Sequence, residues 1–201
     1  MIGIGVLISG SGTNLQALID NIEAGKLDAK IVLVVSSNES AYGLQRAEAA
    51  GIETMALRPS DYDDPDAADR KIADALLAKG ADYVIMAGYM RMVGGPLLRA
   101  FPNKIVNLHP ALLPSFPGAH GIADAFEHGV KVTGVTVHFA NADMDAGPII
   151  AQRAVPVLEN DTLETLEARI HETEHQLYPE VVQLLAQGKV RVEGRKVRIS
   201  D

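Results

Sequence analysis

The chain has 201 residues, 47% of them hydrophobic but only 4% aromatic, which predicts a single α/β domain with an aliphatic, alanine-rich core. Its 18 Lys and Arg residues against 26 Asp and Glu give a net charge of −8, which argues against a general nucleic-acid or anionic-membrane surface. A local basic pocket that binds phosphate is still compatible with this charge. The chain contains no cysteine, so disulfides, thiol catalysis and thiolate metal sites are excluded.

The first eight residues are apolar, lack a basic start and are too short for a signal sequence or a membrane span. We therefore expect a soluble, cytoplasmic protein. Residues Ile2 to Ile8 are predicted to form a buried strand, followed by a turn with glycine at positions 10 and 12. A helix follows, for which Asn14 is the expected N-cap, with Leu15 and Leu18 on its buried face.

A glycine-rich strand-to-helix turn directs backbone N–H groups and the helix dipole at an anion. The dinucleotide fingerprint requires a third glycine, where this chain has Leu15, and an acid after the second strand, where it has Ser36-Ser37-Asn38. Both departures favour a phosphate monoester over a dinucleotide. A tight turn needed only for packing is the alternative.

Further elements alternate along the middle of the chain. A helix is expected over Ala41 to Ala50, a strand over Ile52 to Leu57, a helix from Pro65 towards Gly80, and a buried strand over Tyr83 to Ala87. Arg91 follows that strand. It is either a solvated surface charge or a residue near the ligand crevice that forms at the carboxyl ends of parallel strands.

Asn107 and His109 are the residues around which we interpret the chain. A short strand is predicted from Lys104 to Leu108, and a stiff loop with prolines at 110, 114 and 117 follows it. Alternate strand residues share a face, so both side chains are expected to point the same way and to form a polar pair for a carbonyl-type substrate. The alternative is that they only satisfy loop backbone groups.

The last third predicts a short helix (Ile122 to His128), strands over Val132 to Ala140 and Ile149 to Val157, and a long helix (Thr162 to Gly188) bent or interrupted at Pro179. A hairpin over residues 190–199 is expected as an antiparallel edge. Strands that alternate with helices predict a doubly wound, mostly parallel α/β sheet of the Rossmann-like kind, with antiparallel C-terminal edge strands.

Five segments together resemble the phosphoribosylglycinamide formyltransferase family, in the right order and over almost the full length. They are Leu7-Ile-Ser-Gly-Ser-Gly-Thr-Asn-Leu-Gln16, Ala87-Gly-Tyr-Met-Arg91, Asn107-Leu-His-Pro-Ala-Leu-Leu-Pro114, Thr136-Val-His-Phe139 and Met144-Asp-Ala-Gly-Pro-Ile149. Methionyl-tRNA formyltransferase and formyltetrahydrofolate deformylase share the Asn-x-His-Pro core but carry an additional domain. We expect instead one formyltransferase domain over residues 1–201, its N-terminal half on the ribonucleotide-phosphate side and its C-terminal half on the folate side.

The resemblance implies transfer of the formyl group of 10-formyltetrahydrofolate, a cosubstrate, to the amine of glycinamide ribonucleotide in purine synthesis, without a metal. It implies a catalytic trio of Asn107, His109 and Asp145, in which Asp145 favours the charged form of His109. The matching ribonucleotide-binding positions are Gly12, Thr13, Asn14 and Glu174. The matching folate-binding positions are Met90, Arg91, Met92, Val93, Asn141, Ala142, Asp143 and Met144, although from its residue type and place we prefer ordinary turn chemistry for Asp143. His120 and His138 match positions near the site.

One position departs from the family pattern. The family often has a basic residue there that contacts substrate, whereas this chain has Pro65 between acidic neighbours. Either Arg58 or Arg70 substitutes, or the contact is absent. A deformylase-type hydrolase and a non-catalytic nucleotide-binding module are the alternative functions. The expected partners are small molecules, not nucleic acid or membrane, and a homodimer is one alternative for the assembly.

Overall fold

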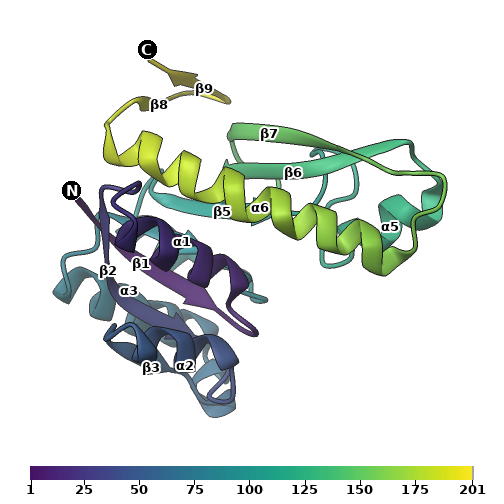
Figure 1. The fold of residues 1–201 in the computed structure, drawn as a ribbon. Coiled ribbons are helices and arrows are strands. Elements are labelled where there is room, and N and C mark those ends of the chain that lie inside the picture. Colours follow the sequence, from purple (N-terminus) through teal and green to yellow (C-terminus); the bar gives the residue numbers. More distant parts are fainter. Residues whose placement is uncertain (201) are drawn as a thin grey trace.

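A seven-stranded sheet with the strand order β3-β2-β1-β4-β5-β6-β7 organises residues 1–200, the part of the chain that the computed structural model describes (Figure 1). Five strands are parallel: β1 (Ile2–Ile8), β2 (Ala29–Ser36), β3 (Thr54–Ala56), β4 (Tyr83–Met86) and β5 (Ile105–His109). At the far edge, β6 (Val132–Phe139) runs antiparallel to β5, and β7 (Ile149–Pro156) runs antiparallel to β6.

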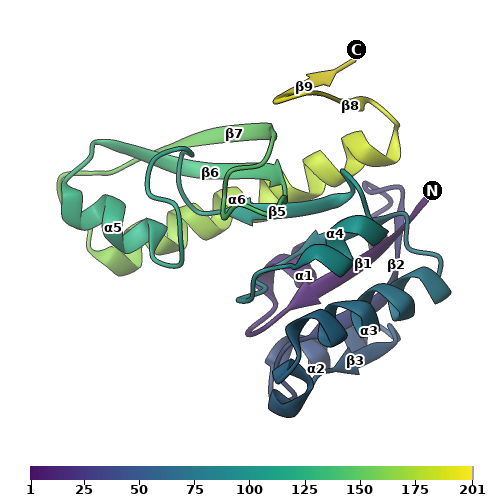
Figure 2. The same ribbon diagram turned by 180° about the vertical axis from the view of Figure 1, so that it is seen from behind.

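Helices cover both faces of the sheet. On one face lie α1 (Thr13–Glu23), α2 (Tyr42–Ala49) and the long α6 (Leu163–Ala186) (Figure 1). The opposite face carries α3 (Pro65–Ala78) and α4 (Gly95–Ala100), with the short 3-10 turn η1 (Pro59–Tyr62) before α3 (Figure 2). Helix α5 (Gly121–His128) packs beside α6.

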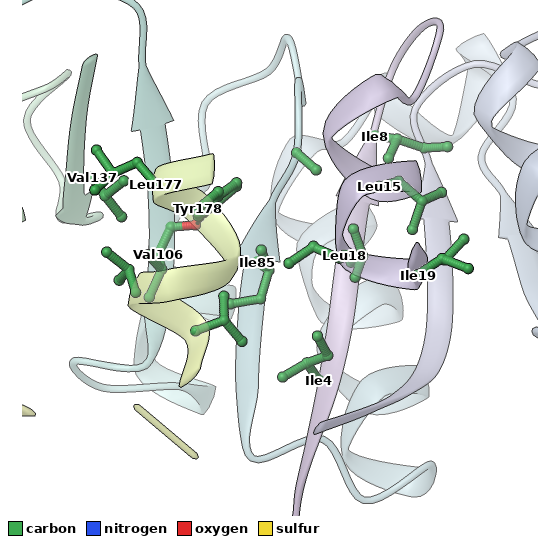
Figure 3. Packing of buried hydrophobic residues seen from close by; sticks show 14 of the residues in the cluster. Ile4, Ile8, Leu15, Leu18, Ile19, Ile85, Val106, Val137, Leu177 and Tyr178 are labelled. Atoms are coloured by element: carbon green, nitrogen blue, oxygen red, sulfur yellow. Dashed lines mark hydrogen bonds between the residues drawn. The ribbon is translucent and has the colours of Figure 1, made fainter. Parts of the chain in front are cut away.

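The alternation of β1 divides the core into two layers. Ile4, Val6 and Ile8 point into the cluster beneath α1 and α6, whereas Leu7 points into the cluster beneath α3 and α4. Figure 3 shows the first of these layers, where Leu15 and Leu18 of α1 face the same sheet surface as Leu177 and Tyr178 of α6. All four β1 side chains are inaccessible to solvent, and full burial of such a side chain contributes about 1.5–3 kcal/mol.

Tyr178 joins α6 to the ends of two central strands. Its ring is completely buried, and its hydroxyl lies 2.9 Å from both the Met86 carbonyl of β4 and the Val106 carbonyl of β5. A buried phenol needs a hydrogen-bond partner, and here the partners are backbone groups beside Asn107. The long helix is therefore anchored to the end of β4 and to the residue of β5 that precedes Asn107.

The predicted fold class is confirmed, and three local expectations need correction. Gly12, not Asn14, is the N-cap of α1, because its left-handed backbone turns the chain so that the helix starts at Thr13. Helix α6 continues through Pro179 as one element. The predicted hairpin exists as β8 (Val190–Glu193) and β9 (Lys196–Ile199), but it forms its own two-stranded sheet against β7. Within residues 1–200, no helix is long and apolar enough to cross a membrane.

Candidate active site

A cavity of about 500 Å³ opens where β1, β4 and β5 end. Carboxyl ends of parallel strands are the usual place for ligands in an open α/β sheet. Its walls come from the glycine turn after β1, the loop after β4, the end of β5, the loop before β7, and the middle of α6. Segments far apart in the sequence therefore meet around one hollow.

Glycine is required at position 12 at one end of the cavity. Its φ of +71° is a left-handed conformation, and a Cβ there would lie 2.6 Å from the Gly43 Cα. The Arg46 Nε donates a 2.8 Å hydrogen bond to the Ser11 carbonyl, and Gly43 N–H donates to the Gly10 carbonyl. The turn is thus packed tightly against α2, and the free backbone N–H groups at the start of α1 lie beside the cavity.

Glu174 of α6 forms the cavity wall next to this turn. Its carboxylate is almost fully buried, and one oxygen accepts hydrogen bonds of 3.0 Å from the Asn14 amide and from His171 Nδ1. The hydrogen bond with Glu174 raises the pKa of His171, against the opposing effect of partial burial. The long helix therefore supplies an anchored carboxylate and a half-exposed imidazole at this end of the cavity.

Asn107 and His109 both line the cavity from β5, as their predicted common face requires. The Asn107 Nδ2 lies 3.2 Å from His138 Nε2, while His138 Nδ1 lies 3.0 Å from the Phe139 carbonyl. Because a carbonyl only accepts, His138 Nδ1 carries a hydrogen, while its Nε2 faces both the Asn107 amide and Asp145 Oδ1, which lies 3.7 Å away. His138 thereby orients the Asn107 amide and leaves its second N–H available.

His109 is buried between two acceptors. Its Nε2 donates a 2.7 Å hydrogen bond to the Phe116 carbonyl, and its Nδ1 lies 3.4 Å from an Asp145 carboxylate oxygen. The ring thus presents one nitrogen to a backbone carbonyl and the other to a carboxylate. Gly121 leaves the room that the ring needs, since a Cβ there would lie 3.0 Å from Nε2.

Asp145 comes from the loop between β6 and β7 and has an unusual backbone conformation, with a φ of +52°. Its carboxylate accepts a 2.8 Å hydrogen bond from Gly118 N–H, which ties this loop to the proline-rich loop. Burial raises the pKa of Asp145, but the His138 imidazole, the Gly118 N–H and the charge of His109 together hold it below its usual value. The side chain is therefore a carboxylate at neutral pH.

The mouth of the cavity is lined by flexible, mostly exposed side chains: Met90, Arg91, Met92 and Met144. The other four residues that matched the folate side are absent from the lining: Val93, Asn141, Ala142 and Asp143. Val93 is buried under α3, and Asp143 N–H donates to the Asn141 side chain in a local turn. His120 is exposed at the start of α5 and is also outside the cavity lining.

The acidic segment around Pro65 has a structural role in capping a helix. The Asp64 carboxylate accepts from Ala67 N–H and caps α3, while Pro65 occupies the first turn. Arg58 pairs with Asp61 at 3.7 Å and Arg70 with Asp64 at 3.8 Å, and neither arginine lines the cavity. In this structure neither arginine takes the place of a basic residue at position 65.

The sequence alone singled out neither His171 nor Tyr62 as a site residue. The structure instead places His171 in the cavity wall and puts Tyr62 beneath Arg91, its ring centroid 3.5 Å from the guanidinium carbon. Helical spacing of three residues from Glu174 was the available signal for His171. Within residues 1–200, no three His, Cys, Asp or Glu side chains are arranged to hold a metal ion.

Comparison with known proteins assigns the chain to a family. The formyl transferase family model matches residues 3–182. The phosphoribosylglycinamide formyltransferase of Bacillus subtilis is 43% identical over 180 residues, which is 90% of this chain and 92% of that protein. The trifunctional purine biosynthetic protein adenosine-3 of Bos taurus is 45% identical over 98% of this chain, which corresponds to 19% of that longer protein.

A solved structure supports the same assignment. The crystal structure of glycinamide ribonucleotide transformylase 1 from Symbiobacterium toebii superposes with a TM-score of 0.97 at 53% identity, covering 100% of this chain and 95% of the other. In the present structure Asn107, His109 and Asp145 line one cavity. The chain belongs to the phosphoribosylglycinamide formyltransferase family.

Proposed function

We propose that this protein transfers the formyl group of 10-formyltetrahydrofolate to the amine of glycinamide ribonucleotide, in purine synthesis, as one cytoplasmic formyltransferase domain. The observation that carries the proposal is the joint placement of an amide, an imidazole and a carboxylate in one cavity wall. Such groups match the needs of acyl transfer to an amine, which are a donor for the oxyanion and a path for a proton.

The ribonucleotide binds at the glycine-turn end in this proposal. Gly12, Thr13 and Asn14 direct backbone N–H groups at the phosphate, where the dipole of α1 also favours negative charge. Glu174, already bonded to Asn14, accepts from hydroxyl groups of the ribose. The reduced folate enters from the methionine-lined mouth, and its formyl group reaches Asn107 and His109 between the two ends.

The reaction proceeds by attack of the amine nitrogen on the formyl carbon, which forms a C–N bond and places negative charge on the formyl oxygen. The free N–H of Asn107 and the imidazolium of His109 stabilise that charge. The attacking nitrogen then loses a proton, N10 of the folate gains one, and the bond between the formyl carbon and N10 breaks. The products are formyl-glycinamide ribonucleotide and tetrahydrofolate.

His109 has to change one contact to take part. Its Nε2 is held by the Phe116 carbonyl, whereas its Nδ1 faces Asp145. In the proposed mechanism Asp145 retains the Nδ1 side, and Nε2 turns from Phe116 towards the formyl oxygen. Asp145 thereby keeps the imidazolium charged and oriented during the reaction.

The decisive measurement is the absorbance change on mixing the protein with 10-formyltetrahydrofolate and glycinamide ribonucleotide. The proposal requires donor consumption that depends on the amine and yields formylated ribonucleotide in equal amount. Equal consumption without the amine would favour the hydrolase alternative. No consumption, with saturable binding of NAD instead, would favour a nucleotide-binding module.

A further inference from the structure

Arg91 at the cavity mouth differs from most arginines of this chain. Six others pair with carboxylates, but Arg91 has no ion pair within residues 1–200. Instead its guanidinium lies over the Tyr62 ring, with the guanidinium carbon 3.5 Å from the ring centroid. One face of the cation is thus occupied by an aromatic ring, and its N–H edge stays free for an anion.

Tyr62 is itself fixed in place from two sides. Its hydroxyl lies 3.1 Å from that of Tyr89, which is buried in the core beneath α3 and α4. The 3-10 turn that carries it is closed by Asp61, whose carboxylate accepts from Arg58 N–H at 2.7 Å and from Lys71 Nζ at 3.0 Å. Burial raises the pKa of both tyrosines, so both hydroxyls stay neutral.

The segment that carries Arg91 is also held at both ends. Met90 N–H donates a 2.8 Å hydrogen bond to the Ser9 hydroxyl, and Gly94 N–H donates to the buried Asp69 carboxylate. A Cβ on Gly94 would lie 2.7 Å from that carboxylate, so a larger residue would displace it. Between these two ties, the direction of the Arg91 side chain is set by the ring beneath it.

We propose that Tyr62 is a positioning residue that aims Arg91 at a carboxylate of the ligand in the cavity mouth. This inference rests on the proposed function, because the carboxylate we assign to Arg91 is that of the glutamate end of the reduced folate. The exposed Met90, Met92 and Met144 around Arg91 offer apolar contact to the aromatic part of such a ligand. Arg91 thereby provides a basic contact for the ligand, which Pro65 and its acidic neighbours do not, and Tyr62 holds Arg91 in place.

The test compares two formyl donors that differ only in the glutamate, 10-formyltetrahydrofolate and 10-formyltetrahydropteroate. Tyr62→Leu is expected to raise the KM of the glutamate-bearing donor about 2- to 30-fold, the range that a cation–π contact provides, with little change in kcat. The KM of the pteroate donor should stay within about twofold. Tyr62→Phe keeps the ring and should show a smaller effect than Tyr62→Leu.

A double-mutant cycle connects the effect to Arg91. In an Arg91→Leu background, Tyr62→Leu should raise the KM of the glutamate-bearing donor no further, since the cation that it positions is gone. Tyr42→Leu is the matched control, because Tyr42 stacks under Arg46 at 4.9 Å but lies outside the cavity lining. It should leave both donor KM values unchanged.

Equal KM increases with both donors, or additive effects of the Tyr62 and Arg91 substitutions, would overturn the positioning role. Circular dichroism and thermal unfolding of each variant separate that outcome from misfolding. Calorimetry with the same two ligands lacking the formyl group, tetrahydrofolate and tetrahydropteroate, measures binding without catalysis. A wild-type protein that binds tetrahydrofolate but transfers no formyl group would refute the proposed function and leave the positioning role of Tyr62 intact.

Discussion

The glycine-turn end of the cavity and its methionine-lined mouth differ in what holds their groups in place. At the first, Gly12 packs against Gly43 and the Glu174 carboxylate is buried at 3% exposure. At the second, Met90 and Met144 are 68% and 56% exposed. A polar group has to be fixed by packing and hydrogen bonds before it can recognise charge, whereas apolar contact tolerates adjustable side chains. Substitutions are therefore expected to cost more at the turn than at the mouth.

The largest effect is expected between the two ends, in the trio itself. Asn107→Ala and His109→Ala should each lower kcat about 10²–10³-fold with smaller changes in KM, because both groups act on the oxyanion. Asp145→Asn should lower kcat as well and shift the NMR titration of the His109 ring. The losses should be far from additive in the double variants. If Asp145→Asn left kcat and the titration unchanged, the carboxylate would be only a loop contact.

Gly12→Val tests the rigid end. The substitution places a Cβ 2.6 Å from the Gly43 Cα in a backbone with φ of +71°, so the turn has to move. We expect the ribonucleotide KM to rise at least about tenfold, with a donor KM near that of wild type. Steady-state kinetics with each substrate varied in turn measures both values. A parallel rise in both would indicate general misfolding and contradict the phosphate assignment.

His171 gives a smaller, pH-dependent effect at the same end. Its pKa is raised in the folded state by Glu174, so its contribution to stability is complete below the unfolded pKa of about 6.5 and is lost as the pH rises through the folded value. The side chain is 50% exposed, so solvent screening keeps this contribution below about 1 kcal/mol. Urea unfolding of wild type and His171→Gln should differ most in acid and converge in alkali. A difference that grew with pH would contradict the pairing.

Met144→Ala at the mouth is expected to have the smallest effect. The side chain is 56% exposed and makes adjustable apolar contact, so the donor KM should change by about threefold or less, with no loss of thermal stability. A change as large as that of Gly12→Val would show that the mouth is as tightly built as the turn, and the contrast between the two ends would fail.

Local sequence determined the elements and the residues at their ends. Ile4, Val6 and Ile8 give β1 one buried face and Leu7 a second, and Pro65 begins a helix because its missing N–H costs nothing there. The common face of Asn107 and His109 follows from the period of a strand, which depends only on neighbouring residues. The corrected N-cap of α1 is a case where Gly12, through its left-handed conformation, outweighed a favourable Asn14.

Tertiary packing alone decided which distant groups meet. Glu174 bonds to Asn14 across 160 positions of the chain, and His171 is in the cavity wall only because α6 lies across the sheet with that face inward. The 3.4 Å approach of Asp145 to His109 depends on the tie between two loops at Gly118, and the stack of Arg91 on Tyr62 depends on how η1 packs against the loop after β4. Local propensities contain no information on such distances, because they arise when whole helices and loops settle on the sheet.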